Sequence, residues 1–424
     1  MARDHMPIQI GLPPVTAWHV AEASSISYIA FIAGEALPDP GEAFIAAGRA
    51  FGSAPLETEA IAIDDERVAW AFGFHIARRE ARIIMWCERA VDGATPDGAA
   101  QNAKWVVFLE TLLEPTRAVD DAIALAATVA RVASERTLLV YDPLLGTAWK
   151  PEEFVELFLD ESEHRGALLD ERHLYRVELN ARDRVNGPYW ISTVGLARVS
   201  KPELEMLEVP VADVRAALEL IDALAARFVS EDMPAAGAPF EAGPDLRIAL
   251  VPAAEAVQTL AHNAPGDATD RRALVGPRAA LCAAGKRGSF KQIWITPFDE
   301  LGRLTRNEAG LFLAPRVAQV RAFRAQSTWS MFVSAFASSL PSAVFLAKIA
   351  RDRTDGEREH MWITVSEATH EGGCGTPDRS TTAGEILHFH HGDISDWRVV
   401  GLRSDVAEVG PESAAILHTF FPQL

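Results

Sequence analysis

Short runs of β-branched and aromatic residues recur along the whole chain, and segments with helical periodicity separate them. Residues 27–32 and 189–193 are runs of this kind, and in residues 68–76 every second side chain is large and apolar. Strands and amphipathic helices bury their apolar faces only by packing on one another. The pattern therefore predicts an α+β protein of two or three mixed modules, in which helices cover sheets.

The clearest helix is predicted over residues 214–228. Its apolar residues recur at the spacing of one helical face, and the charged residues lie off that face; the apolar positions are Val214, Ala217, Leu218, Ile221, Leu224, Ala225 and Phe228. A second helix is predicted over residues 117–136, with acids near its start and arginines near its end, as the helix dipole favours. Both helices are expected to face a core.

A chain of 424 residues is longer than one ordinary domain. Residues 233–245 are dense in Pro, Ala and Gly without periodicity, which is typical of a linker. We therefore predict an N-terminal α+β module over residues 20–145 and a second α+β segment over residues 146–232, as one domain or two. The C-terminal half, residues 245–424, is predicted to end in a helix followed by a strongly bent antiparallel sheet.

The chain has 59 acidic and 40 basic residues, which gives a formal net charge of −19. This charge argues against binding to nucleic acid or to an anionic membrane, and it favours a basic partner. Residues 325–347 carry no charge, but their serines and Pro341 favour a buried helix, a proline stop and a strand over a membrane span.

Three cysteines, Cys87, Cys282 and Cys374, lie far apart, as suits a reducing compartment. The first residues also lack the cationic and apolar segments of a secretory signal, so a cytoplasmic location is expected. The sequence contains no Gly-x-Ser-x-Gly, His-Glu-x-x-His or Cys-x-x-Cys motif and no phosphate loop. Standard hydrolase, zincin and nucleotide-binding functions therefore lose support, and no cofactor is expected.

Histidines cluster near the C-terminus, at His388, His390 and His391. On a strand, His388 and His390 would share one face at a spacing that can chelate a metal. A third ligand would have to come from Asp393, Asp396 or His360. A metal-assisted hydrolase is therefore one hypothesis. General acid-base catalysis by one of these histidines is a second, and a structural or solvated role is the third. Cys374, in a glycine cluster expected to form a mobile exposed turn, is a weaker candidate nucleophile.

Two carboxylates, Glu203 and Glu205, stand two residues apart in a strand-like segment. They would share one face and could act as acid and base or bind a cation, but their apolar neighbours favour a half-exposed strand. Basic residues gather further along the chain, which predicts either an anion-facing surface or a solvated face; they are Arg271, Arg272, Arg278, Lys286, Arg287, Lys291, Arg303, Arg306, Arg316, Arg321 and Arg324.

Residues 359–365, followed at a distance by residues 392–397, resemble the hallmark pattern of a bacterial domain family of unknown function, the YegJ-like domain. Residues 325–332 and 344–349 are similar to its helix and its first strand, so the resemblance covers about residues 317–405. The loop at residues 369–382 is longer than the usual turn of that family.

A second resemblance lies upstream of the first. Residues 189–198 and 203–207 carry a Trp-x-x-Thr-x-Gly-Leu and a Glu-Leu-Glu signature, and they are similar to an uncharacterised module that commonly precedes the YegJ-like domain. Both resemblances imply an architecture and no established reaction.

The signature residues also have a structural interpretation. Trp362 and Trp397 would each bury a large apolar surface, about 2 kcal/mol or more, and hold strands together. Asp393 and Asp396 fit a turn, where short carboxylates accept backbone N–H groups. The candidate binding residues are Trp362, Trp397, Asp393, Asp396, Glu203 and Glu205, and the metal hypothesis adds His388 and His390.

From the net charge and the missing catalytic motifs we predict a non-enzymatic protein of the bacterial cytoplasm that binds a protein partner through an acidic surface, as immunity proteins and antitoxins do. The alternative is the metal-assisted hydrolase, and a third hypothesis is a small-anion binder that uses the arginines. The oligomeric state stays open.

Overall fold

The computed structural model describes most of the chain: residues 18, 24–50, 55–63, 65–76, 82–91, 101–133, 136–158, 170–183, 187–258, 260–274, 276–284, 296–306, 309–338, 343–352, 358–377, 386–403 and 406–417. It divides into two compact units. Unit 1 comprises Met1–Asp160 and Glu171–Leu313, and unit 2 comprises Glu161–Asp170 and Ala314–Leu424. The described strands form three sheets, two in unit 1 and one in unit 2.

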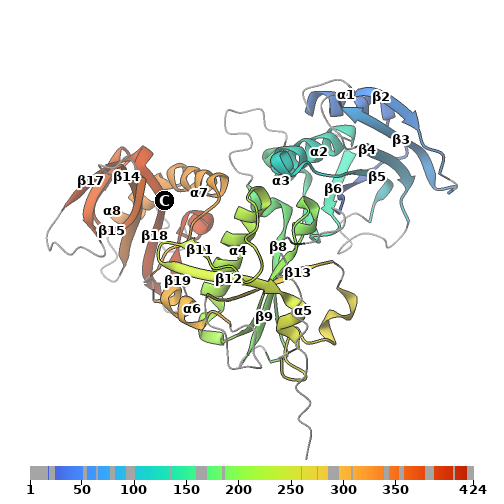
Figure 1. Cartoon of the computed structure of the whole chain (residues 1–424). Coiled ribbons are helices and arrows are strands. Elements are labelled where there is room, and N and C mark those ends of the chain that lie inside the picture. Colours follow the sequence, from blue (N-terminus) through green and yellow to red (C-terminus); the bar gives the residue numbers. More distant parts are fainter. Residues whose placement is uncertain are drawn as a thin grey trace, which may run out of the picture. The chain divides into compact units, whose positions relative to one another are not determined.

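The first sheet of unit 1 is antiparallel throughout, with the order β2-β3-β4-β5-β1-β6-β7. Its strands are β1 (Ile26–Ala33), β2 (Pro55–Ala60), β3 (Val68–Ile76), β4 (Ile83–Arg89), β5 (Ala103–Thr111), β6 (Thr137–Asp142) and β7 (Thr147–Trp149). Its helices are α1 (Pro40–Ala50), α2 (Ala118–Ala133) and α3 (Pro151–Phe158) (Figure 1).

The two faces of this sheet differ. Alternate residues of β1, such as Tyr28 and Ala30, are fully buried on the face that α2 covers. The opposite face carries half-buried aromatic side chains, and the rings of Trp86 and Phe108 stack there with their centroids 4.6 Å apart. Glu88 and Glu110 lie on the same face by alternation along β4 and β5.

The second sheet of unit 1 has the order β11-β12-β13-β10-β9-β8. Only β10 and β13 pair in parallel among its described ladders. The strands are β8 (Arg176–Ala181), β9 (Tyr189–Val194), β10 (Glu203–Val209), β11 (Phe240–Gly243), β12 (Leu246–Pro252) and β13 (Arg278–Ala283).

Helices and a loop cover both faces of this second sheet. Helix α4 (Val214–Ser230) packs on β9 and β10 from one side, and the short helix α6 (Phe298–Thr305) packs beside it. On the other side α5 (Ala253–Val257) closes a core that includes Trp190, Leu207 and Val251. Strand β10 is therefore buried on both faces, and the expectation of a half-exposed strand is wrong.

A buried ion pair links the segments that carry the two sheets of unit 1. The Arg198 guanidinium donates to both carboxylate oxygens of Asp142, at 2.6 and 2.8 Å, and both side chains are fully buried. Asp142 also accepts the backbone N–H of Leu145 at 3.1 Å. Removing either partner would leave a buried charge without compensation, so the pair holds this junction in one arrangement.

Unit 2 contains helices α7 (Pro315–Ser327) and α8 (Trp329–Ala337) and an antiparallel sheet with the order β17-β16-β15-β14-β18-β19. Trp329, Phe332 and Trp397 lie at the centre of its core. The strands are β14 (Val344–Asp352), β15 (Arg358–Thr369), β16 (Gly372–Pro377), β17 (Leu387–His390), β18 (Ile394–Arg403) and β19 (Val406–Val409).

The α+β class predicted from the sequence is confirmed, and the helices predicted over residues 117–136 and 214–228 are α2 and α4. Within the described part of residues 325–347, a helix ends at Ala337 and a strand begins at Val344. No helix among the described residues has both the length and the apolar character that a membrane span needs. Residues 233–245 lie within unit 1, and the predicted domain limits stay a prediction.

Candidate ligand-binding pocket

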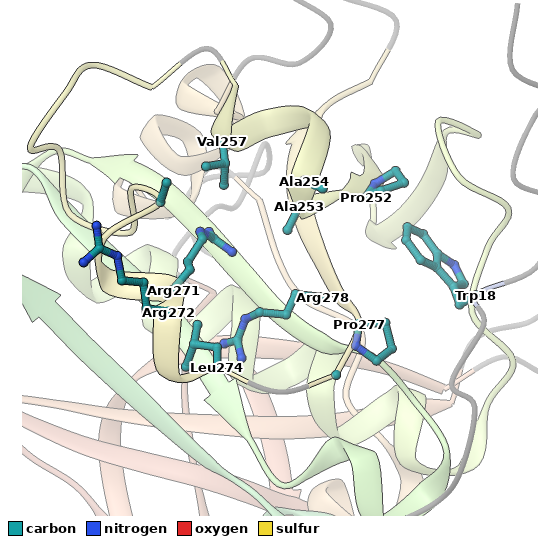
Figure 2. Close-up of a pocket in the computed structure, with 12 residues that line it drawn as sticks. Trp18, Pro252, Ala253, Ala254, Val257, Arg271, Arg272, Leu274, Pro277 and Arg278 are labelled. Atoms are coloured by element: carbon teal, nitrogen blue, oxygen red, sulfur yellow. The ribbon is translucent and has the colours of Figure 1, made fainter.

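A pocket of about 650 Å³ opens in unit 1 where β12 ends and β13 begins. Figure 2 shows its labelled residues, which come from the end of β12, from α5, from the segment that leads into β13, and from Trp18. In this view Trp18 lies at one end of the pocket, and Arg271 and Arg272 lie at the other. The described residues that line the pocket carry charge at three positions, Arg271, Arg272 and Arg278.

Two of these arginines are fixed by a buried carboxylate on β10. Glu205 is fully buried, and its Oε1 accepts Arg271 Nη2 at 2.6 Å while its Oε2 accepts Arg278 Nε at 3.2 Å. Trp190 Nε1 donates to the same Oε2 at 3.3 Å, and both guanidinium carbons lie within 6 Å of the Trp190 ring centroid, at 5.4 and 5.9 Å. The two arginines are therefore held in place by charge, hydrogen bonds and an aromatic ring.

Glu203, the other carboxylate predicted on this strand, fixes the neighbouring segment by accepting hydrogen bonds from it. Its Oε2 accepts the Thr193 hydroxyl at 2.7 Å, and its Oε1 accepts the Gly195 N–H at 2.8 Å. Gly195 has φ of +124°, and a Cβ there would lie 2.4 Å from the Leu174 carbonyl oxygen, so the position requires glycine. Thr193 O in turn accepts Arg278 Nη2 at 3.3 Å.

The residues of the Trp-x-x-Thr-x-Gly-Leu and Glu-Leu-Glu signatures therefore form one hydrogen-bonded network beneath the pocket. The structure brings Glu203 and Glu205 together on one face, as the alternation predicts. Their oxygens accept donors of the chain itself, so the network positions arginines and backbone; the acid-base and cation-binding hypotheses for this pair gain no support.

The loop that carries Arg271 is tied down at several points. Asp267 accepts the backbone N–H groups of Asn263 at 2.9 Å and Thr269 at 2.8 Å, and Asp270 pairs with Arg182 at 2.8 Å. Burial raises the pKa of the Asp267 carboxyl, but its backbone donors and Arg182 outweigh that effect, so the pKa is lower than usual.

Gly266 brings the same loop close to the Trp190 ring. Its φ is +82°, and a Cβ there would lie 2.9 Å from Trp190 Cγ. Its carbonyl oxygen accepts Arg271 Nε at 2.6 Å. The close approach of loop and ring therefore sets the place of Arg271 directly.

Each of the three arginines retains guanidinium donors that have no acceptor within the described chain. A guanidinium carries five N–H groups, and within the described chain Nη1 of Arg271 and Nη1 of Arg278 have no hydrogen-bond acceptor. Arg272 is exposed, and its side chain has no acidic partner among the described residues. Glu205 neutralises one of the three positive charges, so the pocket remains favourable for an anion.

The rest of the described lining is apolar. Pro252, Ala253, Ala254 and Val257 form one wall, with Leu274 and Pro277 on the segment before β13. Trp18 lies at the end of the pocket, and its Nε1 donates to the carbonyl oxygen of Pro234 at 2.8 Å. A volume of this size, an apolar lining and a few fixed polar groups are the usual features of a small-molecule site.

The tryptophans predicted as binding residues in unit 2 have different environments. Trp397 is fully buried, and its Nε1 donates to Thr328 Oγ1 at 3.1 Å and to the Ala325 carbonyl oxygen at 3.2 Å. Trp362 is half-buried, with the Arg398 guanidinium 4.7 Å from its ring centroid. Trp397 therefore anchors α7 and α8 to β18, and a binding role for Trp362 stays a prediction.

The two aspartates predicted as binding residues, Asp393 and Asp396, lie in different elements of unit 2. Asp393 lies in a short turn and accepts the backbone N–H of His390 at 2.9 Å, as expected for a turn residue. Asp396 lies within β18, opposite Lys348 on β14, so the expectation that it lies in a turn is wrong. Burial raises the pKa of Asp396 and lowers the pKa of Lys348, although each charge moderates the shift of the other.

His388 and His390 are both exposed on β17, and they share one face as predicted. The nearby His391 ring lies 2.9 Å from the Gln326 carbonyl oxygen, through Nε2. Among the described residues no group of three metal-ligating side chains occurs, so neither the metal-site prediction for His388 and His390 nor the hydrolase hypothesis gains support.

Cys374 is buried within β16, where it pairs with His388. The expectation that its glycine cluster forms a mobile exposed turn is wrong, because Gly372, Gly373 and Gly375 belong to that strand and contact neighbouring backbone closely. A thiol in this position is not accessible to a substrate, which removes the physical basis for a nucleophilic role.

Sequence reasoning found part of the pocket. Arg271, Arg272 and Arg278 belong to the basic cluster noted in the sequence, but Lys286, Arg287 and Lys291 fall outside the described residues and Arg316, Arg321 and Arg324 belong to unit 2. Sequence spacing alone could not show that Arg271, Arg272 and Arg278 are the members of this cluster that line the pocket. Trp18 was missed, because a single tryptophan far upstream gives no sign that it lies beside Pro277.

One segment of the chain is similar to a known family. Residues 178–280 match a family model described as "Protein of unknown function (DUF4026) C-terminal". This range contains the tryptophan and glutamate signatures and all three pocket arginines, so this segment is similar to a family of unknown function. That it is the module that commonly precedes the YegJ-like domain stays a prediction. No curated protein and no solved structure matches the chain. The resemblance of residues 317–405 to the YegJ-like domain stays a prediction.

Proposed function

We propose that the chain is a non-enzymatic binding protein whose unit 1 pocket binds a small organic anion. The observation that carries the proposal is the set of three arginines that line one pocket, two of them locked by the buried Glu205. Fixed guanidinium groups bind carboxylates and phosphates strongly because little side-chain entropy is lost on binding. Apolar side chains line the rest of the pocket and offer contacts to the organic part of such a ligand.

Calorimetric titration of the full chain with organic carboxylates and phosphates, at constant ionic strength, tests this proposal. Arg272→Ala should weaken binding at least tenfold, because a charge-assisted hydrogen bond contributes about 1.5–3 kcal/mol. Arg247→Ala is the matched control, since Arg247 is also exposed but lies on β12 five residues from Pro252, about 17 Å along the strand. Equal binding by both variants, or no binding by wild type, would refute the proposal.

A second function, interaction with a basic protein partner in the bacterial cytoplasm, is favoured by the net charge of −19. An immunity or antitoxin-like protein would cover its target in this way. The half-buried aromatic face of the first sheet, flanked by Glu88 and Glu110, offers an apolar centre with acidic neighbours, as protein interfaces do. The proposal includes no nucleic acid and no membrane as partners.

This second function has its own test. A basic partner found by affinity capture should bind purified protein with an affinity that falls steeply as salt rises from 50 to about 300 mM, because exposed charges are screened. Replacing Trp86 and Glu110 together should weaken that affinity, whereas Arg272→Ala should not. An affinity that changes neither with salt nor on replacement of Trp86 and Glu110 would exclude this second function.

A further inference from the structure

We infer that the ligand of this pocket is amphipathic: a single anionic group bound by the arginines and an aromatic or branched apolar body that extends to Trp18. This inference rests on the proposed anion-binding function and specifies its ligand class. The pocket is too large and too apolar for an inorganic anion to be its natural occupant, since its volume of about 650 Å³ lies in the range of sites for drug-sized molecules.

The positions of the polar and apolar residues support the inference. Figure 2 shows Arg271 and Arg272 at one end of the pocket and Trp18 at the other, with Ala253, Pro277 and Arg278 between them. A ligand that reaches both ends needs a charged group on one side and an apolar surface on the other. A hydrophilic dianion or polyanion would bury its polar groups against alanine and proline, which is unfavourable without hydrogen-bond partners.

The hydrogen bonding of Trp18 indicates what kind of apolar group the ligand carries. Its only polar group, Nε1–H, is satisfied by the Pro234 carbonyl oxygen at 2.8 Å. What remains is an indole ring, whose preferred partners are apolar and aromatic surfaces. Trp18 is therefore the specificity residue of the pocket in this account, and the arginines are its charge-recognition residues.

Three probes of different chemistry test the inference by calorimetry on the full chain at constant ionic strength: 2-naphthoate, inorganic phosphate and the neutral 2-naphthamide. We expect 2-naphthoate to bind at least tenfold more tightly than either of the other two. Naphthyl phosphate serves as a fourth probe, because it separates a carboxylate preference from a general preference for an anion on an aromatic body.

Two variants locate the binding. Trp18→Ala should weaken 2-naphthoate binding about tenfold and leave the weak phosphate binding unchanged, whereas Arg272→Ala should weaken both. Trp105→Ala is the matched control for the tryptophan, because Trp105 is half-buried in unit 1 on β5 and does not line the pocket. Thermal unfolding of each variant shows whether it folds. If Trp18→Ala does not fold, Trp18→Phe is used in its place, because it keeps an apolar ring at this position.

The outcomes separate the two claims. If phosphate binds as tightly as 2-naphthoate and both respond to Arg272→Ala, the amphipathic ligand is wrong and the anion-binding function stands. If 2-naphthoate and 2-naphthamide bind equally, or if Trp18→Ala has no effect on 2-naphthoate, the assignment of the two ends is overturned. If none of the probes binds, both claims fail.

Discussion

At the scale of the residue, the two carboxylates of β10 show how a strand can bury charge. Glu205 has no exposed surface and still binds two guanidinium groups and an indole N–H. A buried carboxylate costs several kcal/mol to desolvate, and only such complete pairing offsets that cost. The same contacts keep the arginines in place whether or not a ligand is present.

Substituting this carboxylate tests its role. Glu205→Gln leaves two guanidinium groups with a neutral partner, so we expect a loss of about 3 kcal/mol in the free energy of unfolding, measured with denaturant. Glu219→Gln is the control, because Glu219 is 53% exposed in its pair with Arg215 and should change stability by less than about 0.5 kcal/mol. Equal effects of the two substitutions would show that Glu205 is not the anchor described above.

The loop aspartate gives a pH-dependent prediction. The pKa of Asp267 is lower in the folded chain than in the unfolded chain, so its contribution to stability is complete above the unfolded pKa and is lost as the pH falls through the folded pKa. Asp267→Asn removes that contribution. The stability gap between wild type and variant should be constant from pH 7 to about pH 5 and should shrink below about pH 4. A gap that widens on acidification would contradict the assignment.

At the scale of the element, helices α2 and α4 and strands β1, β3 and β9 could be predicted from the sequence, because their apolar residues repeat with a clear period or form short continuous runs. Strand β10 was misjudged because Glu203 and Glu205 look like a solvent-facing row. Their charges are buried because Arg271, Arg278 and backbone N–H groups reach them from distant segments, and no local pattern contains that information. The glycine cluster of β16 was misjudged for a similar reason, since close backbone packing requires those glycines.

The two tryptophans of unit 2 provide an element-scale prediction. Trp397 joins β18 to the junction of α7 and α8 through two hydrogen bonds and complete burial. Trp397→Phe should therefore lower the free energy of unfolding by about 2 kcal/mol through lost hydrogen bonds and a cavity. Trp362→Phe, at a half-buried position, should cost less than about 1 kcal/mol. A larger loss at Trp362 would reverse the roles given to the pair.

At the scale of the whole molecule, the α+β class followed from composition and periodicity, whereas the pocket did not. Its described residues are Trp18 and, from 234 to 260 positions further along the chain, residues of the end of β12, of α5 and of the entry to β13. Such a site forms only through tertiary packing, so sequence reasoning could indicate a basic cluster without choosing its members. The tryptophan and glutamate signatures, recognised as a pattern, turn out to support the pocket without lining it.

A crystal structure with a bound aromatic carboxylate would show whether the unit 1 pocket is an anion site. Crystals of the full chain soaked in 4-iodobenzoate would show the iodine by its anomalous signal. We expect an iodine peak in the unit 1 pocket on the side of Trp18, with the carboxylate against Arg271, Arg272 or Arg278. A pocket without this peak, in crystals where the ligand is bound elsewhere or where the pocket is open to solvent, would contradict it.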